Sequence, residues 1–367
     1  MITLADHVDR ARRAAYDLQH AVNADGAYAN IAWPGIVKRA GLRGRDAAFA
    51  TELAYGTLRW RGLYDSIIAE LFDRPIEKLD PMLLDVLRLG VHQLLSMRVA
   101  SHAAVDETVK LARSLRGDGA AKLVNALLRK IASTDRDAWV ARLAPDANPE
   151  RLAQQTSHPA WILSAYRDVL GCSWDELEPL LRIDNEPGEV TLVARAMSQD
   201  ELIEATDGRP GRWSPRAVVL EAGAAEEIAA VRDGRAGVQD EGSQLTALAL
   251  AAAPIDGSDR QWLDLCAGPG GKAALLSSLA NERGAQLTAV EIHEHRAQLL
   301  RSALAPFDVD VVCADATDVV WPERFDRVLV DVPCTGIGVV RRRPDLRWRR
   351  TPADVARVTP LQRSLLE

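Results

Sequence analysis

The stretch that decides the fold is Trp262-Leu-Asp-Leu-Cys-Ala-Gly-Pro-Gly-Gly-Lys272, an apolar segment that runs into a glycine-rich loop. It predicts a strand, a tight turn and the start of a helix. The loop glycines allow backbone N–H groups to approach a ligand closely, and the first turn of the helix adds a partial positive charge. Residues 266–272 are therefore a candidate ligand-binding loop.

Acidic residues follow the loop at the ends of three further apolar segments. Segment 287–291 predicts the next strand and ends at Glu291, about 20 residues beyond the loop, the usual offset for a carboxylate that holds ribose hydroxyls. Strand 309–313 is followed by Asp315, and a buried strand is predicted over 325–331, where it ends in Asp331. Ligands of open α/β sheets bind at the carboxyl ends of the strands, so we expect these acids at one sheet edge.

The rest of the chain predicts a multidomain protein. Residues 1–135 have apolar residues at helical spacing, with helices expected over 11–22, 45–60, 63–72, 81–97, 104–115 and 120–131. A linker with one short helix (136–160), further helix (160–182), strands at 189–194 and 217–220 and a helix at 200–205 follow. From residue 236, strands alternate with helices, which indicates a parallel sheet. A helix over 244–253 precedes the first strand and is expected to be capped by Asp240 or Ser243.

These patterns predict three parts: an all-α domain (1–140), a linker helix with a small α+β subdomain (141–235), and an α/β Rossmann-like domain (236–367). With 47% hydrophobic and 26% charged residues, the composition is that of a soluble globular protein without a membrane span or signal peptide. The formal net charge of −7 argues against a uniformly basic nucleic-acid binder but leaves room for local basic patches.

The cysteines bear on compartment and on metals. Cys172, Cys266, Cys313 and Cys334 are widely scattered, with neither the density of a disulfide framework nor the paired spacing of a zinc site. We therefore expect a cytoplasmic protein without a bound metal.

The glycine loop alone does not identify its ligand. Residues 268–273 match G-x-G-x-x-A, so a nicotinamide dinucleotide stays open, as does a structural turn without a ligand. A P-loop is excluded, because Cys266 occupies its first glycine position and Ala273 replaces the Ser/Thr that should follow Lys272. Three acids would repel a pyrophosphate, whereas they suit a nucleoside with a cationic centre, as in S-adenosylmethionine.

A thiol stands at the end of the last predicted strand, in Asp331-Val-Pro-Cys334. Most cysteines are small buried hydrophobes, which is our expectation for Cys266 and Cys313. A thiol at a ligand edge also suits pyrimidine chemistry. A thiolate that adds to carbon 6 of cytosine makes carbon 5 nucleophilic enough to attack a sulfonium methyl group; a base then removes the carbon-5 proton and the thiolate leaves. Asp331 can hold the amino edge of the base.

Six arginines and one tryptophan follow within residues 341–350, here called the arginine segment. Arginine fits phosphate oxygens through its planar fork, and tryptophan offers a stacking surface for an unpaired base. We expect RNA contacts from Arg341, Arg342, Arg343 and Arg347. A second basic group lies on the helical domain, as either a solvated face or a further patch: Lys38, Arg39, Arg43, Arg45, Arg59, Arg61, Lys122, Arg129 and Lys130.

Taken together, these residues resemble the RNA (cytosine-5) methyltransferase family, and within it the Sun-type ribosomal RNA enzymes of bacteria. Residues 266–272 resemble the cofactor loop, in which the family commonly has alanine at the position of Gly268. Residues 331–345 resemble the Pro-Cys motif with its arginine tail, and 238–240 with Gln244 resemble a motif that packs beside the cofactor. Further similar segments are 45–59, 104–112 and 124–129 (NusB-like RNA-binding domain) and 160–235 (RNA-recognition-like subdomain).

The resemblance implies methylation of carbon 5 of a cytidine in 16S ribosomal RNA, with S-adenosylmethionine as cofactor. The implied cofactor-binding residues are Cys266, Ala267, Gly268, Pro269, Gly270, Gly271, Lys272, Glu291, Asp315 and Asp331. Among them, Lys272 is expected at the methionine end, Glu291 at the ribose and Asp315 at the adenine. Asp331 and Cys334 are the implied catalytic residues, with Cys334 assisting release of the methylated base.

One part of the family pattern is missing from residues 1–367. The family's attacking cysteine belongs to a later Thr-Cys-Ser motif on the next strand, and this sequence contains no such motif. We therefore expect a truncated chain. The alternative is an RNA-binding or ribosome-assembly factor without catalysis.

Overall fold

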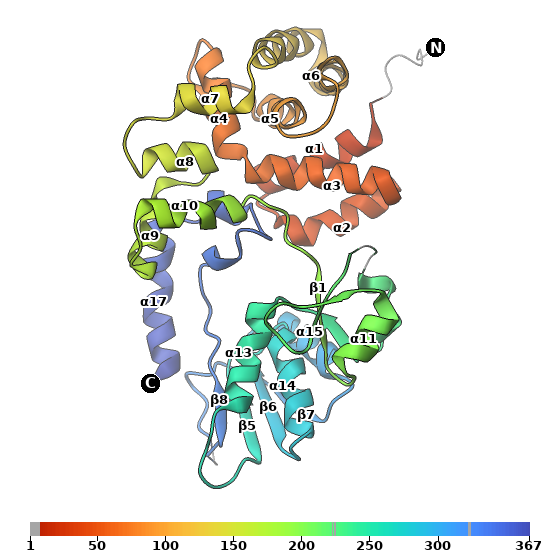
Figure 1. The fold of residues 1–367 in the computed structure, drawn as a ribbon, viewed down its shortest axis with the longest axis vertical. Coiled ribbons are helices and arrows are strands. Elements are labelled where there is room, and N and C mark those ends of the chain that lie inside the picture. The colour runs from red at the N-terminus through yellow and green to blue at the C-terminus, as the bar shows by residue number, and fades with distance from the viewer. Residues whose placement is uncertain (1–7, 222, 224, 322–323) are drawn as a thin grey trace. The chain divides into compact units, whose positions relative to one another are not determined.

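The structure is a computed structural model that describes residues 8–221, 223, 225–321 and 324–367 (Figure 1). The chain forms two compact units. The first comprises Met1–Pro187 with Gly336–Pro352, and the second comprises Gly188–Thr335 with Ala353–Glu367. The arginine segment therefore belongs to the first unit, although it directly follows the Pro-Cys motif of the second.

The first unit is helical, as predicted. Its helices are α1 (Arg10–Asn23), α2 (Ala29–Ala40), α3 (Gly44–Arg59), α4 (Arg61–Leu71), α5 (Pro81–Leu95), α6 (Ser101–Ile131), α7 (Arg136–Leu143), α8 (Glu150–Thr156), α9 (Ala160–Leu170), α10 (Trp174–Ile183) and the short α16 (Leu346–Arg349). Gly90 allows α5 and α6 to pack closely, because a Cβ there would lie 2.7 Å from Leu128 Cδ1. Gly117, at φ 77° and ψ −170°, interrupts α6 between the two helices that the sequence predicts.

Two helices of this unit differ from the prediction. Helix α2 is not among the predicted helices; Pro34 lies in its interior, where proline usually ends a helix. The predicted linker contains two short helices, α7 and α8, in place of one. Leu152 of α8 belongs to a small separate core with Leu163, Leu177 and Leu181, which explains why this segment is ordered as helix.

The second unit begins with a small antiparallel sheet. Its elements are β1 (Thr191–Ala194), α11 (Gln199–Thr206), β2 (Arg209–Pro210), β3 (Ala217–Val219), α12 (Ala229–Arg232) and β4 (Ala236–Val238). The strand order β2-β3-β1-β4 and the β-α-β-β-α-β succession are those of the split βαβ fold, as expected for the RNA-recognition-like subdomain. The sequence did not predict β2 and β4, which have only two and three residues.

The second sheet is parallel, as predicted. Its strands are β5 (Gln261–Asp264), β6 (Gln286–Glu291), β7 (Val309–Cys313) and β8 (Arg327–Leu329). The helices of this part of the chain are α13 (Glu241–Ala252), α14 (Gly271–Asn281) and α15 (Glu294–Leu304), and α17 (Pro352–Leu366) follows them. The strand order is β7-β6-β5-β8. Strand β8 is shorter than predicted and is not buried on both faces, because Val328 is 42% exposed. Asp240 caps α13 by accepting from Gly242 N at 2.9 Å.

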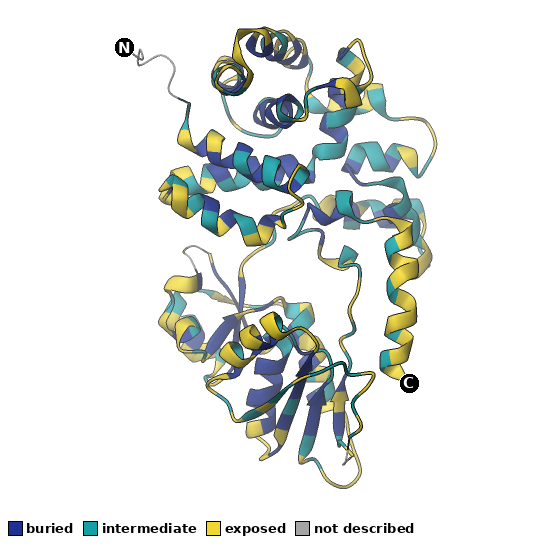
Figure 2. Ribbon diagram, turned by 180° about the vertical axis from the view of Figure 1, so that it is seen from behind, coloured by how far each residue is buried: buried dark blue, intermediate teal, exposed yellow. Residues whose placement is uncertain are grey.

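The core of the parallel sheet is made of small and branched side chains from its strands and from α14, around the buried ring of Trp262. Figure 2 shows β5 and β6, the central strands of this sheet, mainly in the dark blue of buried residues. Ala273 and Leu276 lie on α14 and have no exposed surface. This packing fixes the first turn of α14, and therefore the glycine loop, against the carboxyl edge of the sheet.

Candidate functional site

The register of the parallel sheet brings the predicted acids to one edge. Strand β5 ends at Asp264, which pairs with Ala289 on β6 and with Leu329 on β8. Glu291 and Asp331 each lie two residues beyond these partners. Glu291 pairs with Cys313 on β7, and Asp315 follows two residues later. Four carboxyl groups therefore lie at the ends of successive strands, at the same edge of the sheet as the glycine loop.

The loop has the backbone that its glycines predict. Gly270 has φ 113° and forms the N-cap of α14, and Ala267 N donates to Val290 O at 2.8 Å. At Gly268 a Cβ would lie 2.0 Å from Glu291 Oε2. The glycine therefore lets the Glu291 carboxylate lie directly against the loop, and the alanine that the resembled family commonly has would require the Glu291 side chain to move.

Glu291 is buried and held in place. Its Oε1 accepts from His293 N at 2.9 Å, and Arg296 Nε lies 3.3 Å from its Oε2. Arg296 also donates to the carbonyl oxygen of Gly268, so one guanidinium joins the loop to the acid. A carboxylate has about four lone-pair positions, which leaves capacity for a ligand's hydroxyl groups. The sequence did not single out Arg296, because one arginine on a helix carries no distinguishing pattern.

Asp264 is a second residue that the sequence interpretation missed. It is only 1% exposed, and no side chain among the described residues donates a hydrogen bond to either carboxylate oxygen; the one nearby donor is the backbone N–H of Cys266. Burial raises the pKa of Asp264 to about 7; the Cys266 N–H partly opposes this, the Asp331 charge adds to it and the Lys272 ammonium opposes it. A buried carboxyl group without a side-chain partner is unusual and can be satisfied by an incoming donor or cation.

We expect Asp264→Asn to stabilise the unliganded protein above pH 7. An acid whose folded-state pKa is raised costs stability as pH rises from its unfolded pKa, about 4, through its folded pKa, here about 7. The penalty grows by at most about 1.4 kcal/mol per pH unit in that window. Urea unfolding between pH 5 and 8 measures it, with Asp310→Asn at an exposed site of β7 as the control. Parallel pH profiles for Asp264→Asn and wild type would contradict this account.

Lys272 and Asp331, both predicted site residues, form an ion pair with 2.7 Å between Nζ and Oδ2. Cys266 stands beside them, half-buried. Burial raises the pKa of its thiol to about 11, with the negative charges of Asp264, Glu291 and Asp331 acting in the same direction. The Cys266 thiol therefore stays protonated near neutral pH.

Asp315 and Cys334 lie at the same sheet edge, but no contact among the described residues joins them to this cluster. Asp315 Oδ1 accepts from Thr317 Oγ1 at 2.7 Å and Thr317 N at 3.0 Å, and these bonds lower its pKa. Cys334 is exposed. The neighbouring Pro333 carbonyl accepts from Gln362 Nε2 at 2.8 Å, which ties the Pro-Cys motif to α17.

Gln244, which the resemblance places beside the cofactor, joins the small sheet to α13. Its Nε2 donates to Leu192 O at 3.2 Å and to Gln239 O at 2.9 Å, and its Oε1 accepts from Ser214 Oγ at 2.6 Å. Its amide group is therefore occupied by protein partners, and a role toward the cofactor stays a prediction.

The arginine segment packs against the helical unit. Arg347 has no exposed surface and donates to Arg59 O at 3.1 Å, Asp184 O at 2.6 Å and Asn185 Oδ1 at 2.7 Å. Burial lowers the pKa of Arg347 to about 9. This placement withdraws its guanidinium from the surface, so Arg347 is not retained among the proposed RNA contacts. Arg341, Arg342 and Arg343 are only partly buried.

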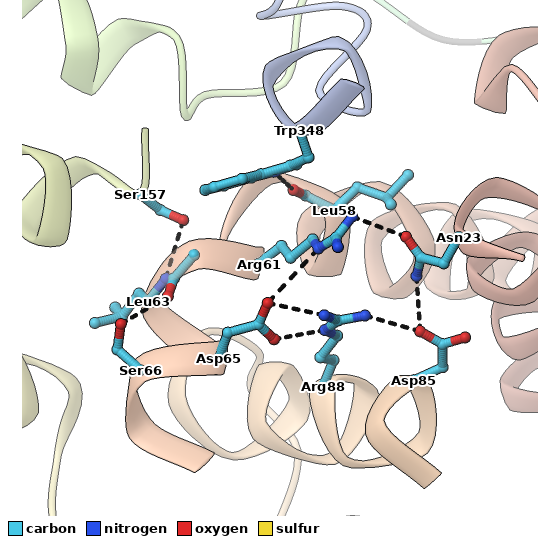
Figure 3. A network of polar contacts seen from close by, with 11 residues as sticks. Asn23, Leu58, Arg61, Leu63, Asp65, Ser66, Asp85, Arg88, Ser157 and Trp348 are labelled. Atoms are coloured by element: carbon cyan, nitrogen blue, oxygen red, sulfur yellow. Dashed lines mark hydrogen bonds and ion pairs between the residues drawn. The ribbon is translucent and has the colours of Figure 1, made fainter. Parts of the chain in front are cut away.

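Trp348 packs beside a network of charged side chains, of which Asp85 and Arg88 are buried (Figure 3). Its indole N–H donates to Leu58 O at 3.0 Å, and the Arg61 guanidinium lies 5.9 Å from its ring centroid. A Cβ on Gly62 would lie 2.3 Å from the ring, so glycine is needed to admit it. Beneath, the network links Arg61, Asn23, Asp85, Arg88 and Asp65 through contacts of 2.6–2.9 Å.

No helix in the described parts of the chain is long and apolar enough to cross a membrane. Across the same residues, no three His, Cys, Asp or Glu side chains gather in a way that could hold a metal ion.

Comparison with known proteins identifies relatives over nearly the whole chain. The family described as 16S rRNA methyltransferase RsmB/F matches residues 249–367, and the NusB family matches residues 9–133. A putative methyltransferase, MT1451, of Mycobacterium tuberculosis (strain CDC 1551 / Oshkosh) is 49% identical over 98% of this chain and 80% of its own length. The probable ribosomal RNA small subunit methyltransferase B of Bacillus subtilis (strain 168) is 32% identical over 93% of this chain and 77% of its own length.

Among solved structures, the crystal structure of PH0851 has the same fold. The TM-score is 0.78 with 22% sequence identity, and the match covers 97% of this chain and 81% of that one.

Proposed function

Since the chain belongs to the RsmB/F family of 16S rRNA methyltransferases and is an RNA methyltransferase, we propose that it methylates carbon 5 of a cytidine in 16S ribosomal RNA with S-adenosylmethionine as methyl donor. The observation that carries the cofactor assignment is the pair of buried carboxyl groups beside the glycine loop. Asp264 has no side-chain partner among the described residues, and Glu291 keeps unused lone pairs. A nucleoside with cationic groups fits such a site, whereas a pyrophosphate does not.

The cofactor, when bound, supplies the methyl group on its sulfonium centre. We assign the loop amides and Lys272 to its methionine end; an ammonium has three donors, so Lys272 can keep Asp331 while it binds a second carboxylate. We assign Glu291 to the ribose hydroxyls and the free oxygen of Asp315 to the adenine. We assign Asp264 to compensating the positive charge of the bound cofactor.

On the substrate side, we assign Asp331 to the amino edge of cytosine and Cys334 to release of the methylated base. Cys334 is exposed and one residue from Pro333, whose carbonyl group is fixed by Gln362. The resemblance gives the first attack on carbon 6 to a Thr-Cys-Ser motif, so no residue of this sequence is assigned to that step.

RNA contact is proposed for the NusB domain and for Arg341, Arg342 and Arg343. The NusB match over residues 9–133 and the ribosomal RNA names of the relatives support this assignment. We propose that the protein acts in the cytoplasm, where ribosomal RNA is available. Neither the nicotinamide alternative nor the non-catalytic alternative gains support from the comparisons.

Mass mapping of 5-methylcytidine in 16S ribosomal RNA tests the proposal. RNA from cells with and without the gene should differ at a cytidine that is methylated only when the gene is present. Restoring the gene should restore the methyl group, and restoring it with Glu291→Ala should not. An identical 5-methylcytidine map in both strains would overturn the proposed substrate.

A further inference from the structure

A cavity of about 710 Å³ lies in the second unit, where the small antiparallel sheet meets the end of α14. Its lining includes Arg195, Gln199, Arg216, Ser278, Glu282 and Phe307. The lining residues of α14 belong to its last turn and the residue after it. The glycine loop lies at the other end of this helix of 11 residues, about 16 Å away. The cavity is therefore separate from the proposed cofactor site.

The unusual feature of this cavity is a buried cation. Arg195 is only 8% exposed, and its buried Nε makes no hydrogen bond with any residue that the structure describes. Burial alone lowers the pKa of Arg195, to about 10, and no carboxylate opposes the effect. Buried arginines are normally paired, because removing an unpaired charge from water is costly.

The surrounding backbone is arranged to hold this side chain. Arg195 N donates to Arg235 O at 2.8 Å, and its carbonyl oxygen accepts from Ser278 Oγ at 2.7 Å. Gly237 on β4 leaves room for the guanidinium, since a Cβ there would lie 2.4 Å from Arg195 Nη2. These contacts hold the backbone of Arg195 in place, and the buried Nε of its guanidinium has no partner in the described parts of the chain.

The other charges of the cavity compensate each other. Arg216 Nη2 lies 2.7 Å from each carboxylate oxygen of Glu282, so this pair is neutral. Gln199 uses its amide N–H to bind Ala217 O at 2.7 Å. The uncompensated charge of the cavity is that of Arg195, which indicates a ligand with a negative charge.

We propose that this cavity is a phosphate-binding site with Arg195 as its principal donor. The planar guanidinium presents paired N–H groups that match two phosphate oxygens. The phosphate has two possible sources. One is the backbone of the RNA substrate, which rests on the proposed function, and the other is a free phosphate ion.

The test compares Arg195→Met with Arg232→Met, which removes the same charge from an exposed site of α12. In the first arm, thermal unfolding is followed with 0 to 10 mM inorganic phosphate (up to ~100 times a Kd on the order of 0.1 mM) at constant ionic strength. We expect a saturable rise in Tm for wild type and Arg232→Met and none for Arg195→Met. In the second arm, affinity for a 16S ribosomal RNA fragment is measured against salt. We expect Arg195→Met to bind about tenfold more weakly, with a salt slope reduced by about one.

A response in the phosphate arm alone identifies a free anion, and one in the RNA arm identifies a backbone phosphate; either supports the site. Equal behaviour of Arg195→Met and Arg232→Met in both arms overturns it. If Arg195→Met fails to fold, Gly237→Ala serves instead, since its Cβ displaces the guanidinium while keeping the charge, and it should lose the same responses. The phosphate arm contains no RNA, so its result tests the anion site even if the proposed RNA substrate is wrong.

Discussion

Glu291→Ala is expected to weaken S-adenosylmethionine binding by about 100-fold, which corresponds to about 3 kcal/mol for two charge-assisted hydrogen bonds to the ribose. The effect should be large because Glu291 is buried and oriented before the ligand arrives, by His293 N and Arg296. Equilibrium dialysis with labelled S-adenosylmethionine measures the change.

Glu294→Ala is the matched control for this substitution. Glu294 lies three residues later at the start of α15, is exposed and pairs with Arg301 at 2.9 Å, so its removal should leave cofactor affinity unchanged. Near-ultraviolet circular dichroism establishes that both variants are folded. A folded Glu291→Ala protein with an affinity within twofold of wild type would show that the ribose assignment is wrong.

Arg347→Met is expected to destabilise the helical unit by about 3 kcal/mol, because it leaves buried acceptors without a donor. The orphaned groups are the carbonyl oxygens of Arg59 and Asp184 and the side-chain oxygen of Asn185. Methionine fills most of the space, so the loss reflects the hydrogen bonds more than a cavity. Urea unfolding followed by tryptophan fluorescence measures it, with Arg45→Met on the exposed surface of α3 expected within about 0.5 kcal/mol of wild type.

RNA binding distinguishes this packing role from the contact that the sequence predicts for Arg347. Under conditions in which the variant is folded, its RNA affinity should have the same salt dependence as wild type. An Arg347→Met protein of unchanged stability whose salt slope falls by about one would instead show that Arg347 binds a phosphate.

The parallel sheet could be predicted because its strands are short apolar runs that end in acids and alternate with helices. Residues 309–313 form β7 with the predicted bounds, and β6 differs by one residue. Prediction failed where local pattern and tertiary packing disagree. Helix α2 forms despite Pro34 because Trp33 and Ile36 are buried in the helical core. The stabilisation from this burial is not part of local helix propensity.

The position of the candidate site was predictable to the extent that its residues follow a spacing rule, and the roles of these residues stay predictions. The loop, Glu291 and Asp331 follow strand ends, and the order of the strands brings them to one edge, where Lys272 of α14 contacts Asp331. Asp264 and Arg296 were missed because their roles depend on burial and on a partner in space. From sequence alone, an arginine in a basic run is expected at the surface. The packing of the helical unit shows that the Arg347 side chain is buried.

Calorimetric titration of the wild-type chain with S-adenosylhomocysteine, in parallel with NAD, tests the central claim most directly. The acids at the strand ends should give saturable binding of S-adenosylhomocysteine at one site per chain and no heat of binding with NAD. Saturable binding of NAD together with no binding of S-adenosylhomocysteine would contradict the account.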